Sequence, residues 1–405
     1  MPLLVQKYGG TSVGTPERIH KVADRIVRSR RAGTDLVIVV SAMGGTTDDL
    51  IDLAHRVSER SHPREMDMLL TAGERISMAL VAMAVSDRGQ EAVSFTGSQS
   101  GIVTDTSHTR AKILEVKADR IREELNRGRV VIVAGFQGVS REREVTTLGR
   151  GGSDTTAVAL AAALGAQECE IYTDVEGVYT ADPRLVPEAR KLQELSYDEM
   201  LELASLGAKV LHNRSVEIAR RFQVPVHVRS SFHETEGSRI RKGDSMEQVV
   251  IRGIAHDPDV AKIALLGVPD RPGVAAEIFR EVGGQGVNVR MIVQAGGSSG
   301  KNDVTFAVGS HDVRQVLPIV ESVRKRLGAR AFVYDPDAAI LSVVGEGLAT
   351  SPGTAGEVFA ALAQAGVNIE IISTSSITIT CIVRKADLEN AVRSLHAALR
   401  LEQER

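Results

Sequence analysis

The stretch Lys7-Tyr8-Gly9-Gly10-Thr11-Ser12 follows the apolar run Leu3-Leu4-Val5 and precedes a helical pattern that begins after Pro16. The apolar positions of that helix are Ile19, Val22, Ile26 and Val27. The order predicts a strand, a glycine turn and a helix. Two glycines without Cβ atoms let backbone N–H groups converge on an anion, and Lys7 adds a positive charge beside them. A tight turn with a solvated lysine fits the hexapeptide equally well.

The bulk composition places the chain among globular proteins of two or three domains, because 405 residues with 43% hydrophobic content exceed one ordinary core. A formal charge of -3 gives no general reason to bind nucleic acid or an anionic membrane. Cys169 and Cys381 lie in strand-like runs, which indicates buried thiols in a reducing compartment. The apolar runs look too short to span a bilayer, and no signal-peptide pattern is present, so we expect a cytoplasmic protein.

Short β-rich runs alternate with longer helical patterns over the first 230 residues or so. The predicted strands are 36–40, 92–95, 130–133, 170–172 and 224–228, and the predicted helices are 66–84, 110–126, 153–164 and 197–211. This alternation predicts an α/β fold in which a mainly parallel sheet is sandwiched by helices. Ligands of such sheets collect at the carboxyl ends of the strands. The segments that follow each strand are therefore candidate site residues.

Two of these segments carry glycines and polar groups. Ser41-Ala42-Met43-Gly44-Gly45-Thr46-Thr47-Asp48 is a second glycine turn ahead of a helix, suited to the other side of an anion cradle. Thr146 to Thr156 holds Arg150 among glycines and leads into an alanine-rich helix, for which Ser153 or Asp154 suits the N-cap. The planar guanidinium group of Arg150 fits a carboxylate or a phosphate. A role of this segment in capping the helix alone stays open.

A third segment, Thr173 to Arg184, is a long irregular connection rich in groups that can hydrogen-bond a nucleotide, although an ordinary surface loop has the same composition. The standard nucleotide-binding motifs G-x-x-x-x-G-K-[ST] and, after a strand, G-x-G-x-x-G do not occur. The histidines lack metal-ligand spacing and no serine lies in G-x-S-x-G, which disfavours structural zinc and a hydrolase triad.

Six motifs in order resemble the aspartate kinases, members of the amino-acid-kinase superfamily. They are KYGGTSV at Lys7 to Val13, SAMGGTTDDL at Ser41 to Leu50, TAGERIS at Thr71 to Ser77, TTLGRGGSDTTA at Thr146 to Ala157, YTDVEGVYTADPR at Tyr172 to Arg184 and GAKVLH at Gly207 to His212. The resemblance covers nearly the whole chain. Asn213 departs from the proline common in the family, which we expect to affect a helix start, and Tyr8 replaces the commoner phenylalanine.

The resemblance implies that Mg-ATP phosphorylates the side-chain carboxylate of L-aspartate to 4-phospho-L-aspartate, the first step toward lysine, threonine and methionine. An aspartate carboxylate is already ionised at neutral pH, so no general base is needed. Positive charge and backbone donors around the phosphoryl group are needed instead, because two anions must meet in line. Lys7, the amides of Gly9 and Gly10, and Ser41 with Gly44 and Gly45 suit this task.

The resemblance also distributes roles over further residues. It adds Tyr8, Thr173, Asp174, Tyr179, Asp182, Arg184 and Lys209 to the ATP-binding set. It assigns aspartate to Thr47, Glu74, Arg150, Gly151, Gly152, Ser153 and Asp154, with Arg150 on a carboxylate and Glu74 on the α-ammonium group. Lys7, Arg150 and Asp154 are the expected catalytic residues, and Asp154 orients the lysine and Mg²⁺. No residue is assigned as a direct metal ligand, since Mg²⁺ is expected mainly on ATP oxygens. A solvated Glu74 paired with Arg75 is the structural alternative.

The last 150 residues or so contain an internal repeat: Asp270 to Phe279 is echoed by Thr350 to Phe359, and Gly286 to Val289 by Gly366 to Ile369, at an offset of 80 positions. Each copy resembles the ACT domain, a βαββαβ module that binds amino acids. The second copy lacks its last strand, and residues 248–255 can supply it, so we expect the first module to be inserted in the second. A sheet one strand short is the alternative.

The expected domains are a catalytic domain over 1–232, a linker over 233–247, a first ACT domain over 261–336, and a second over 248–256 plus 338–405. The resemblance implies that threonine, lysine or both bind where ACT domains of two chains meet. The expected effector residues are Asp270, Gly273, Val274, Ala275, Asn288, Val289, Gln294, Thr354, Asn368, Ile369, Ser375 and Ser376. A homodimer through these domains, or an α2β2 assembly with a subunit started near Met246, is expected; a dimerisation-only role stays open.

Two other interpretations compete with this one. The chain could be another kinase of the superfamily, acting on glutamate, N-acetylglutamate or a nucleoside monophosphate, or a non-catalytic amino-acid sensor with a kinase fold. The tandem repeat and the residues of the motifs at Lys7 and Arg150 argue against the other kinases. The presence of Lys7, Arg150 and Asp154 argues against the sensor.

Overall fold

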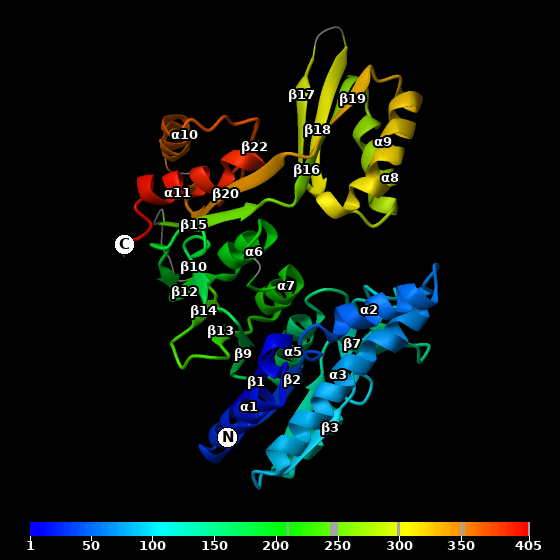
Figure 1. Cartoon of the computed structure of the whole chain (residues 1–405), viewed down its shortest axis with the longest axis vertical. Helices are drawn as coiled ribbons and strands as arrows, with labels where there is room; N and C mark the ends of the chain where they lie inside the picture. The colour runs from blue at the N-terminus through cyan, green and yellow to red at the C-terminus, as the bar shows by residue number, and fades with distance from the viewer. Residues whose placement is uncertain (209, 244–249, 298–299, 349–350, 352, 404–405) are drawn as a thin grey trace. The chain divides into compact units, whose positions relative to one another are not determined.

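A computed structural model describes residues 1–208, 210–243, 250–297, 300–348, 351 and 353–403. The chain divides into two compact units (Figure 1). The first unit comprises residues 1–178, 191–205 and 209–245, and the second comprises 179–190, 206–208 and 246–405. The predicted fold class is confirmed: a large, mainly parallel sheet with helices in the first unit and two small α/β modules in the second.

The first unit is built on an eight-stranded sheet with the strand order β12-β14-β13-β9-β1-β2-β6-β3. Its strands are β12 (Glu194–Ser196), β14 (Ser238–Arg241), β13 (Val226–Ser230), β9 (Glu168–Thr173), β1 (Leu3–Tyr8), β2 (Asp35–Val40), β6 (Val130–Ala134) and β3 (Ala92–Phe95). β1 pairs in parallel with both β2 and β9, so that Tyr8 lies beside Val40 and Tyr172. The segments after these three strands therefore leave the sheet at one edge.

Helices cover both faces of this sheet (Figure 1). The helices of the first unit are α1 (Pro16–Arg31), α2 (Thr46–Val57), α3 (Pro63–Ser86), α4 (Asp119–Asn126), α5 (Gly152–Leu164), α6 (Tyr197–Ser205) and α7 (Asn213–Phe222), with a short 3-10 turn η1 (Gly10–Val13). α1 and α3 pack on the face that carries Tyr8 and Ile38. Side chains alternate along a strand, so Lys7 points to the opposite face, where α5 lies against β1.

The sequence pattern misplaced two helices and one N-cap. Residues 113–116 of the predicted helix 110–126 form β5, because β4 captures them in an antiparallel pair. The helix predicted over 197–211 ends at Ser205, since Gly207 turns the chain at φ 121° with its Cα against the carbonyl of His256. α5 begins at Gly152 with Gly151 as N-cap, because the left-handed φ of Gly151 starts the helix earlier than either polar cap candidate.

The displaced strand belongs to a second, four-stranded sheet of the first unit, with the order β5-β4-β7-β8. Its strands are β5 (Ile113–Val116), β4 (Ile102–Thr104), β7 (Gln137–Ser140) and β8 (Val145–Thr147). A two-stranded sheet consists of β10 (Val178–Tyr179) and β11 (Lys191–Leu192). β7 and β8 lie between β6 and α5 in the chain, so this sheet leads directly into the turn that holds Arg150.

The second unit contains two four-stranded antiparallel sheets, each packed against two helices. One module has the order β17-β18-β16-β19, formed by β16 (Val260–Pro269), β17 (Val289–Gly296), β18 (Lys301–Gly309) and β19 (Ala331–Asp335) with α8 (Val274–Gly284) and α9 (Val313–Leu327). The other has the order β15-β20-β22-β21, formed by β15 (Val250–Asp257), β20 (Ala338–Glu346), β21 (Ile371–Thr374) and β22 (Thr378–Arg384) with α10 (Thr354–Gln364) and α11 (Leu388–Ala398). β15 pairs with β20, so residues ahead of the first copy supply the edge strand of the second sheet.

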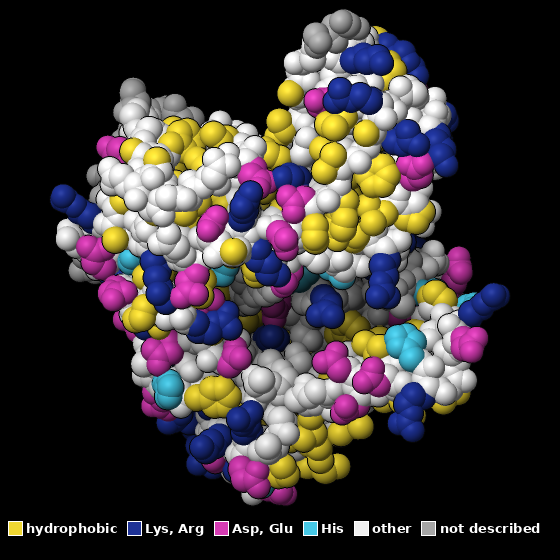
Figure 2. Space-filling view, turned by 45° about the horizontal axis from the view of Figure 1, so that its top comes forward, with side chains coloured by type: hydrophobic (Ala, Val, Ile, Leu, Met, Phe, Trp, Pro, Cys, Tyr) yellow, Lys and Arg dark blue, Asp and Glu magenta, His cyan; other side chains and the backbone are white. Residues whose placement is uncertain are grey.

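The surface and the longest helix bear on the expected partners. Lys/Arg and Asp/Glu side chains are interspersed over the face seen in Figure 2, in keeping with the small net charge.

The expectation that every apolar run is too short to span a bilayer is wrong for α3. By length and composition alone, this helix of 24 residues is long and apolar enough to cross a membrane. One side of α3 nevertheless packs in the core of the first unit, where Asp67 and Glu74 are buried, whereas Ile76 and Met83 on the same helix are exposed.

Candidate active site

The side chain of Lys7 meets Asp154 at the edge of the sheet where β1 ends and α5 begins. The Lys7 Nζ atom lies 2.6 Å from Asp154 Oδ1, and the two side chains are 11% and 12% exposed. Each side chain of a pair so far removed from water depends on the other, because removal of either partner leaves a poorly hydrated charge. The structure thus joins two of the three predicted catalytic residues from segments almost 150 positions apart.

The two glycine turns lie against each other beside this pair. The N–H of Gly44 donates to the carbonyl of Gly10 at 3.0 Å, and the N–H of Gly9 donates to the carbonyl of Tyr172 at 3.2 Å. A Cβ atom on Gly10 would lie 2.8 Å from the carbonyl oxygen of Ala42, so only glycine allows this approach. Among the described residues no acceptor is bonded to the amides of Gly10 and Gly45. These two amides are among the donors that the turns leave for an anion, whereas the amides of Gly9 and Gly44 already have acceptors.

Tyr8, which the resemblance adds to the ATP-binding set, has its side chain in the core. Its ring is fully buried and stacks on Tyr172 with 4.8 Å between centroids. Its hydroxyl donates to Gln6 Oε1 at 3.2 Å, while its carbonyl accepts the N–H of Ser41 at 3.1 Å. Burial therefore raises the pKa of the hydroxyl well above its usual value. The side chain cannot reach a ligand, because alternation along β1 turns it away from Lys7.

The start of α5 carries the predicted aspartate-binding turn. Gly149 and Gly151 adopt φ values of 78° and 68°, which favour glycine, and the exposed Arg150 lies between them. Within the described part of the chain Arg150 makes no ion pair or hydrogen bond, so its guanidinium is available to a ligand. Gly152 and Ser153 are buried at the first turn of the helix.

His212 is a site residue that the sequence reasoning did not single out. A Cβ atom on Gly151 would lie 2.2 Å from its ring carbon, so the imidazole occupies the space that Gly151 leaves open. His212 is also the N-cap of α7, where Nδ1 accepts the N–H of Arg214 at 3.4 Å, and Asn213 is the first helical residue. Burial lowers the pKa of His212, while the nearby Asp154 carboxylate opposes that shift. In the sequence, only its position at the end of the GAKVLH motif indicated that His212 lies near the site.

Glu74 of α3 is a buried carboxyl group turned toward the second glycine turn. Its Oε1 accepts the N–H of Ala42 at 3.2 Å, and its Oε2 has no hydrogen-bond partner among the described residues. Burial raises the pKa of Glu74 to about 7, against 4.5 in water. The described residues show no ion pair with Arg75, which removes the alternative of a solvated pair. Thr47, in the first turn of α2, is half-buried.

The predicted nucleotide residues are divided between the two units. Thr173 ends β9 and its hydroxyl donates to Asp174 at 3.1 Å, within the first unit. Tyr179, Asp182 and Arg184 lie in the segment 179–190, which packs with the second unit. There the guanidinium of Arg184 contacts Asp182 at 2.6 Å and lowers the pKa of that carboxyl group. The predicted phosphate contact Lys209 falls outside the described residues.

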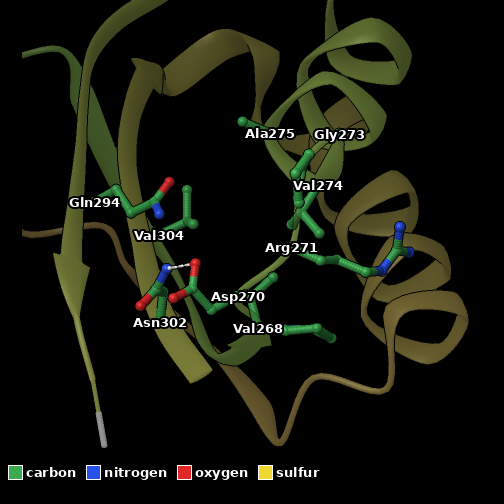
Figure 3. Close-up of a pocket in the computed structure, with 11 residues that line it drawn as sticks. Val268, Asp270, Arg271, Gly273, Val274, Ala275, Gln294, Asn302 and Val304 are labelled. Carbon is green, nitrogen blue, oxygen red and sulfur yellow. Dashed lines mark hydrogen bonds between the residues drawn. The ribbon is translucent and has the colours of Figure 1, made fainter. Parts of the chain in front are cut away.

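The first module of the second unit holds a cavity of about 230 Å³ lined by five predicted effector residues (Figure 3). These five are Asp270, Gly273, Val274, Ala275 and Gln294. Asn302 also lines it and donates to Asp270 at 3.0 Å, a contact that no sequence pattern indicated. In Figure 3 the amide of Gln294 and the Asp270–Asn302 pair lie across from the glycine turn, whereas the side chain of Arg271 points away.

The other effector candidates do not line this cavity. Asn288 and Val289 lie at the start of β17. In the second module, Thr354 begins α10 and donates to Ser351 at 2.8 Å, while Asn368 and Ile369 precede β21. Ser375 and Ser376 lie in the turn between β21 and β22. The candidates therefore form three groups: five line the first module's cavity, two lie at the start of β17, and five lie in the second module at the start of α10 and at either end of β21.

Comparisons with known proteins agree with this architecture. Residues 2–230 match the amino acid kinase family, and residues 262–325 and 341–399 each match an ACT domain. The chain is 51% identical to an aspartokinase of Mycolicibacterium smegmatis over 99% of this chain and 97% of that protein. It is 50% identical to an aspartokinase of Corynebacterium glutamicum over the same shares.

Solved structures give the same result. The crystal structure of E. coli aspartokinase III in complex with aspartate and ADP matches with a TM-score of 0.83 and 26% identity, over 98% of this chain and all of that one. The same enzyme with lysine and aspartate matches with a TM-score of 0.75 and 27% identity, over 98% and 99% of the two chains. With its Lys7–Asp154 pair at the sheet edge and its tandem regulatory modules, the chain belongs to the amino acid kinase family, as an aspartokinase with two ACT domains.

Proposed function

We propose that the protein transfers the γ-phosphoryl group of Mg-ATP to the side-chain carboxylate of L-aspartate and forms 4-phospho-L-aspartate. The observation that carries the proposal is the Lys7–Asp154 ion pair beside two glycine turns whose Gly10 and Gly45 amides lack acceptors among the described residues. The complex of E. coli aspartokinase III with aspartate and ADP supports the substrate assignment.

Lys7 neutralises the phosphoryl group as it passes to the acceptor. The acceptor carboxylate is ionised at neutral pH, so the site needs no base and must instead reduce repulsion between two anions. Asp154 holds the Lys7 ammonium group in place at 2.6 Å. The amides of Gly10 and Gly45 then supply fixed donors, with Ser41 between the two turns, and such preorganised donors stabilise developing charge.

Aspartate is recognised at its two ends by Arg150 and Glu74. The guanidinium of Arg150 is exposed and without a partner among the described residues, which suits a bidentate contact with the substrate α-carboxylate. The unpartnered Oε2 of Glu74 suits the α-ammonium group. Thr47 and the first turn of α5, residues 151–154, complete the pocket between these two charges.

ATP is assigned to the segments that follow β1, β2 and β9 in the first unit, with Thr173 and Asp174. Tyr179, Asp182 and Arg184 are proposed as nucleotide contacts from the resemblance alone. The site is rich in N–H donors and its Asp154 carboxylate is paired with Lys7, a donor set that suits Mg²⁺ held mainly by phosphate oxygens. Bound there, Mg²⁺ would neutralise phosphate charge. Lys209 is proposed as a second phosphate contact from the resemblance alone.

A single assay tests the reaction. Release of ADP is measured with purified protein, Mg-ATP and either L-aspartate, L-glutamate or no acceptor. We expect turnover with aspartate only. Equal ADP release with glutamate would assign the chain to another kinase of the superfamily, and no release with any acceptor would support a non-catalytic sensor. We place the reaction in the cytoplasm, as the first step of lysine, threonine and methionine synthesis, in keeping with two buried free thiols.

Threonine, lysine or both are proposed to regulate the enzyme through the ACT domains. The carboxylate of Asp270 and the amide of Gln294 give the cavity of about 230 Å³ polar groups suited to an amino acid. Calorimetric titration with each amino acid tests this. We expect Asp270→Ala to weaken binding at least about tenfold, and Arg271→Ala to keep it, since that side chain points away from the cavity (Figure 3).

The assembly is proposed to be a homodimer through the ACT domains or an α2β2 complex with a subunit started near Met246. Met246 itself lies outside the described residues. Expression from the native gene and a denaturing gel distinguish the two forms, because a single band excludes the α2β2 complex.

A further inference from the structure

A second buried carboxylate of α3, Asp67, lies outside the site described above. Its side chain is completely buried and collects donors from two other segments. Oδ1 accepts the hydroxyl of Thr147 at 2.5 Å and the N–H of Thr109 at 3.0 Å, while Oδ2 lies 2.6 Å from Nδ1 of His108. A buried carboxylate with this many partners is costly to remove, so it fixes the groups that surround it.

The groups that Asp67 fixes adjoin the arginine turn. Thr147 is the last residue of β8, three positions before Arg150. Thr109 adopts a left-handed φ of 67°, uncommon for a residue other than glycine, and its carbonyl oxygen would lie 3.1 Å from a Cβ atom on Gly149. The 108–109 loop is thus wedged between Asp67 and Gly149.

The far side of the same turn is held by α7. Arg214 donates from Nη1 to the carbonyl of Leu148 at 2.5 Å and from Nη2 to the carbonyl of Ala111 at 2.9 Å. The N–H of Ala111 donates in turn to the carbonyl of Thr147 at 2.8 Å. The backbone that enters the arginine turn is therefore clamped on both sides. Arg150, which follows it, has no contact of its own among the described residues to hold it.

Asp67 and Glu74 share one face of α3, because seven residues are close to two complete turns. The helix rises 1.5 Å per residue, so the two carboxyl groups are about 10 Å apart along its axis. Glu74 contacts the second glycine turn and Asp67 contacts the support of the arginine turn. One rigid helix therefore sets the distance between the two ends of the aspartate pocket.

We propose that Asp67 is a positioning residue for L-aspartate: through Thr147 and Thr109 it holds Gly149 and thereby places Arg150 on the substrate carboxylate. This inference rests on the proposed function, in which Arg150 binds that carboxylate. Asp67 itself touches neither substrate nor nucleotide. Its loss therefore displaces Arg150 without altering the phosphate cradle around Lys7.

Steady-state kinetics of Asp67→Asn test the proposal. We expect the KM for aspartate to rise about tenfold, because a small misplacement of a substrate clamp has large effects. The kcat and the KM for ATP are expected to stay within about twofold, a split that general loss of fold would not produce. Thr147→Val removes only the hydroxyl donor and is expected to raise the same KM; it decides the matter if Asp67→Asn does not fold. Glu65→Gln removes an exposed carboxylate of the same helix, so as a matched control it leaves all constants unchanged.

A double-mutant cycle shows whether Asp67 acts through Arg150. We expect Arg150→Ala to raise the KM for aspartate, and Asp67→Asn to add nothing in that background. Additive effects, or an unchanged KM in both Asp67→Asn and Thr147→Val, would overturn the inference while leaving the proposed function intact. An unchanged KM in Arg150→Ala alone would instead overturn the proposed role of Arg150.

Discussion

We expect aspartate binding to depend on pH in the neutral range, because Glu74 is the proposed partner of the substrate α-ammonium group and its pKa is raised. Burial raises this pKa to about 7, so half of the free enzyme carries a protonated Glu74 at that pH. Only the ionised form attracts an α-ammonium group. The ionised fraction is about 9% at pH 6 and about 91% at pH 8 for a pKa near 7. We therefore expect kcat/KM for aspartate to increase about tenfold between these two values.

Initial rates at limiting and at saturating aspartate, from pH 6 to pH 8, measure this dependence. The kcat should change little, because bound aspartate holds Glu74 ionised. Glu74→Gln should have a low kcat/KM for aspartate that does not change between pH 6 and pH 8. Glu65→Gln, which removes an exposed carboxylate of the same helix, is the matched control and should keep the wild-type profile. A flat wild-type profile, or an unchanged slope in Glu74→Gln, would refute the role assigned to Glu74.

The same pKa predicts how the stability of the ligand-free protein changes with pH. The folded state holds the Glu74 proton more tightly than the unfolded chain, whose pKa is 4.5. The stabilisation is fully present below pH 4.5 and is lost as pH rises through about 7. At about 1.4 kcal/mol per pH unit, the free energy of unfolding loses about 3 kcal/mol over this range. Denaturant unfolding of the wild type and of Glu74→Gln at several pH values measures this loss, which Glu74→Gln should not show. Saturating aspartate should reduce the loss in the wild type.

Three further substitutions test other parts of the structure. Lys7→Ala should lower kcat by about a thousandfold or more, and it should also lower the melting temperature because it leaves the buried Asp154 carboxylate without its partner. Nearly full turnover would contradict the phosphoryl-transfer chemistry. Gly151→Ala should lower the melting temperature and weaken aspartate binding, because the new Cβ at φ 68° would lie 2.2 Å from the His212 ring; an unchanged protein would exclude that contact. Thr180→Val should lower the free energy of unfolding in urea by about 1–3 kcal/mol, because it removes the buried hydroxyl that lies 2.9 Å from Nε2 of His396. Thr180→Ser keeps a hydroxyl and should keep most of that stability.

Local patterns in the sequence were sufficient for the elements whose conformation depends on neighbouring residues. Alternation of short apolar runs with helical spacing predicted the parallel sheet, and β1, β2 and β9 are found where it placed them. The helix after Pro16 buries Ile19, Val22 and Ile26 as predicted. The repeated Pro-Gly turns predicted two copies of one module. These features follow from backbone preferences and from which side of an element is apolar, and both can be read within a dozen residues.

Long-range pairing decided the remainder. Residues 113–116 have helical spacing but form a strand, because β4 offers them a partner. Tyr8 lies in the predicted phosphate-binding motif, but its side chain faces the core, since the ladder of β1 determines which side chains point to α5. The contact of His212 with Gly151, the donors around Asp67 and the Asn302–Asp270 bond join segments at least 30 positions apart. The sequence by itself determined which residue types bring the chemistry of phosphoryl transfer to this protein. Only the tertiary structure decided which of them meet, because burial and contact depend on where distant segments of the chain come together.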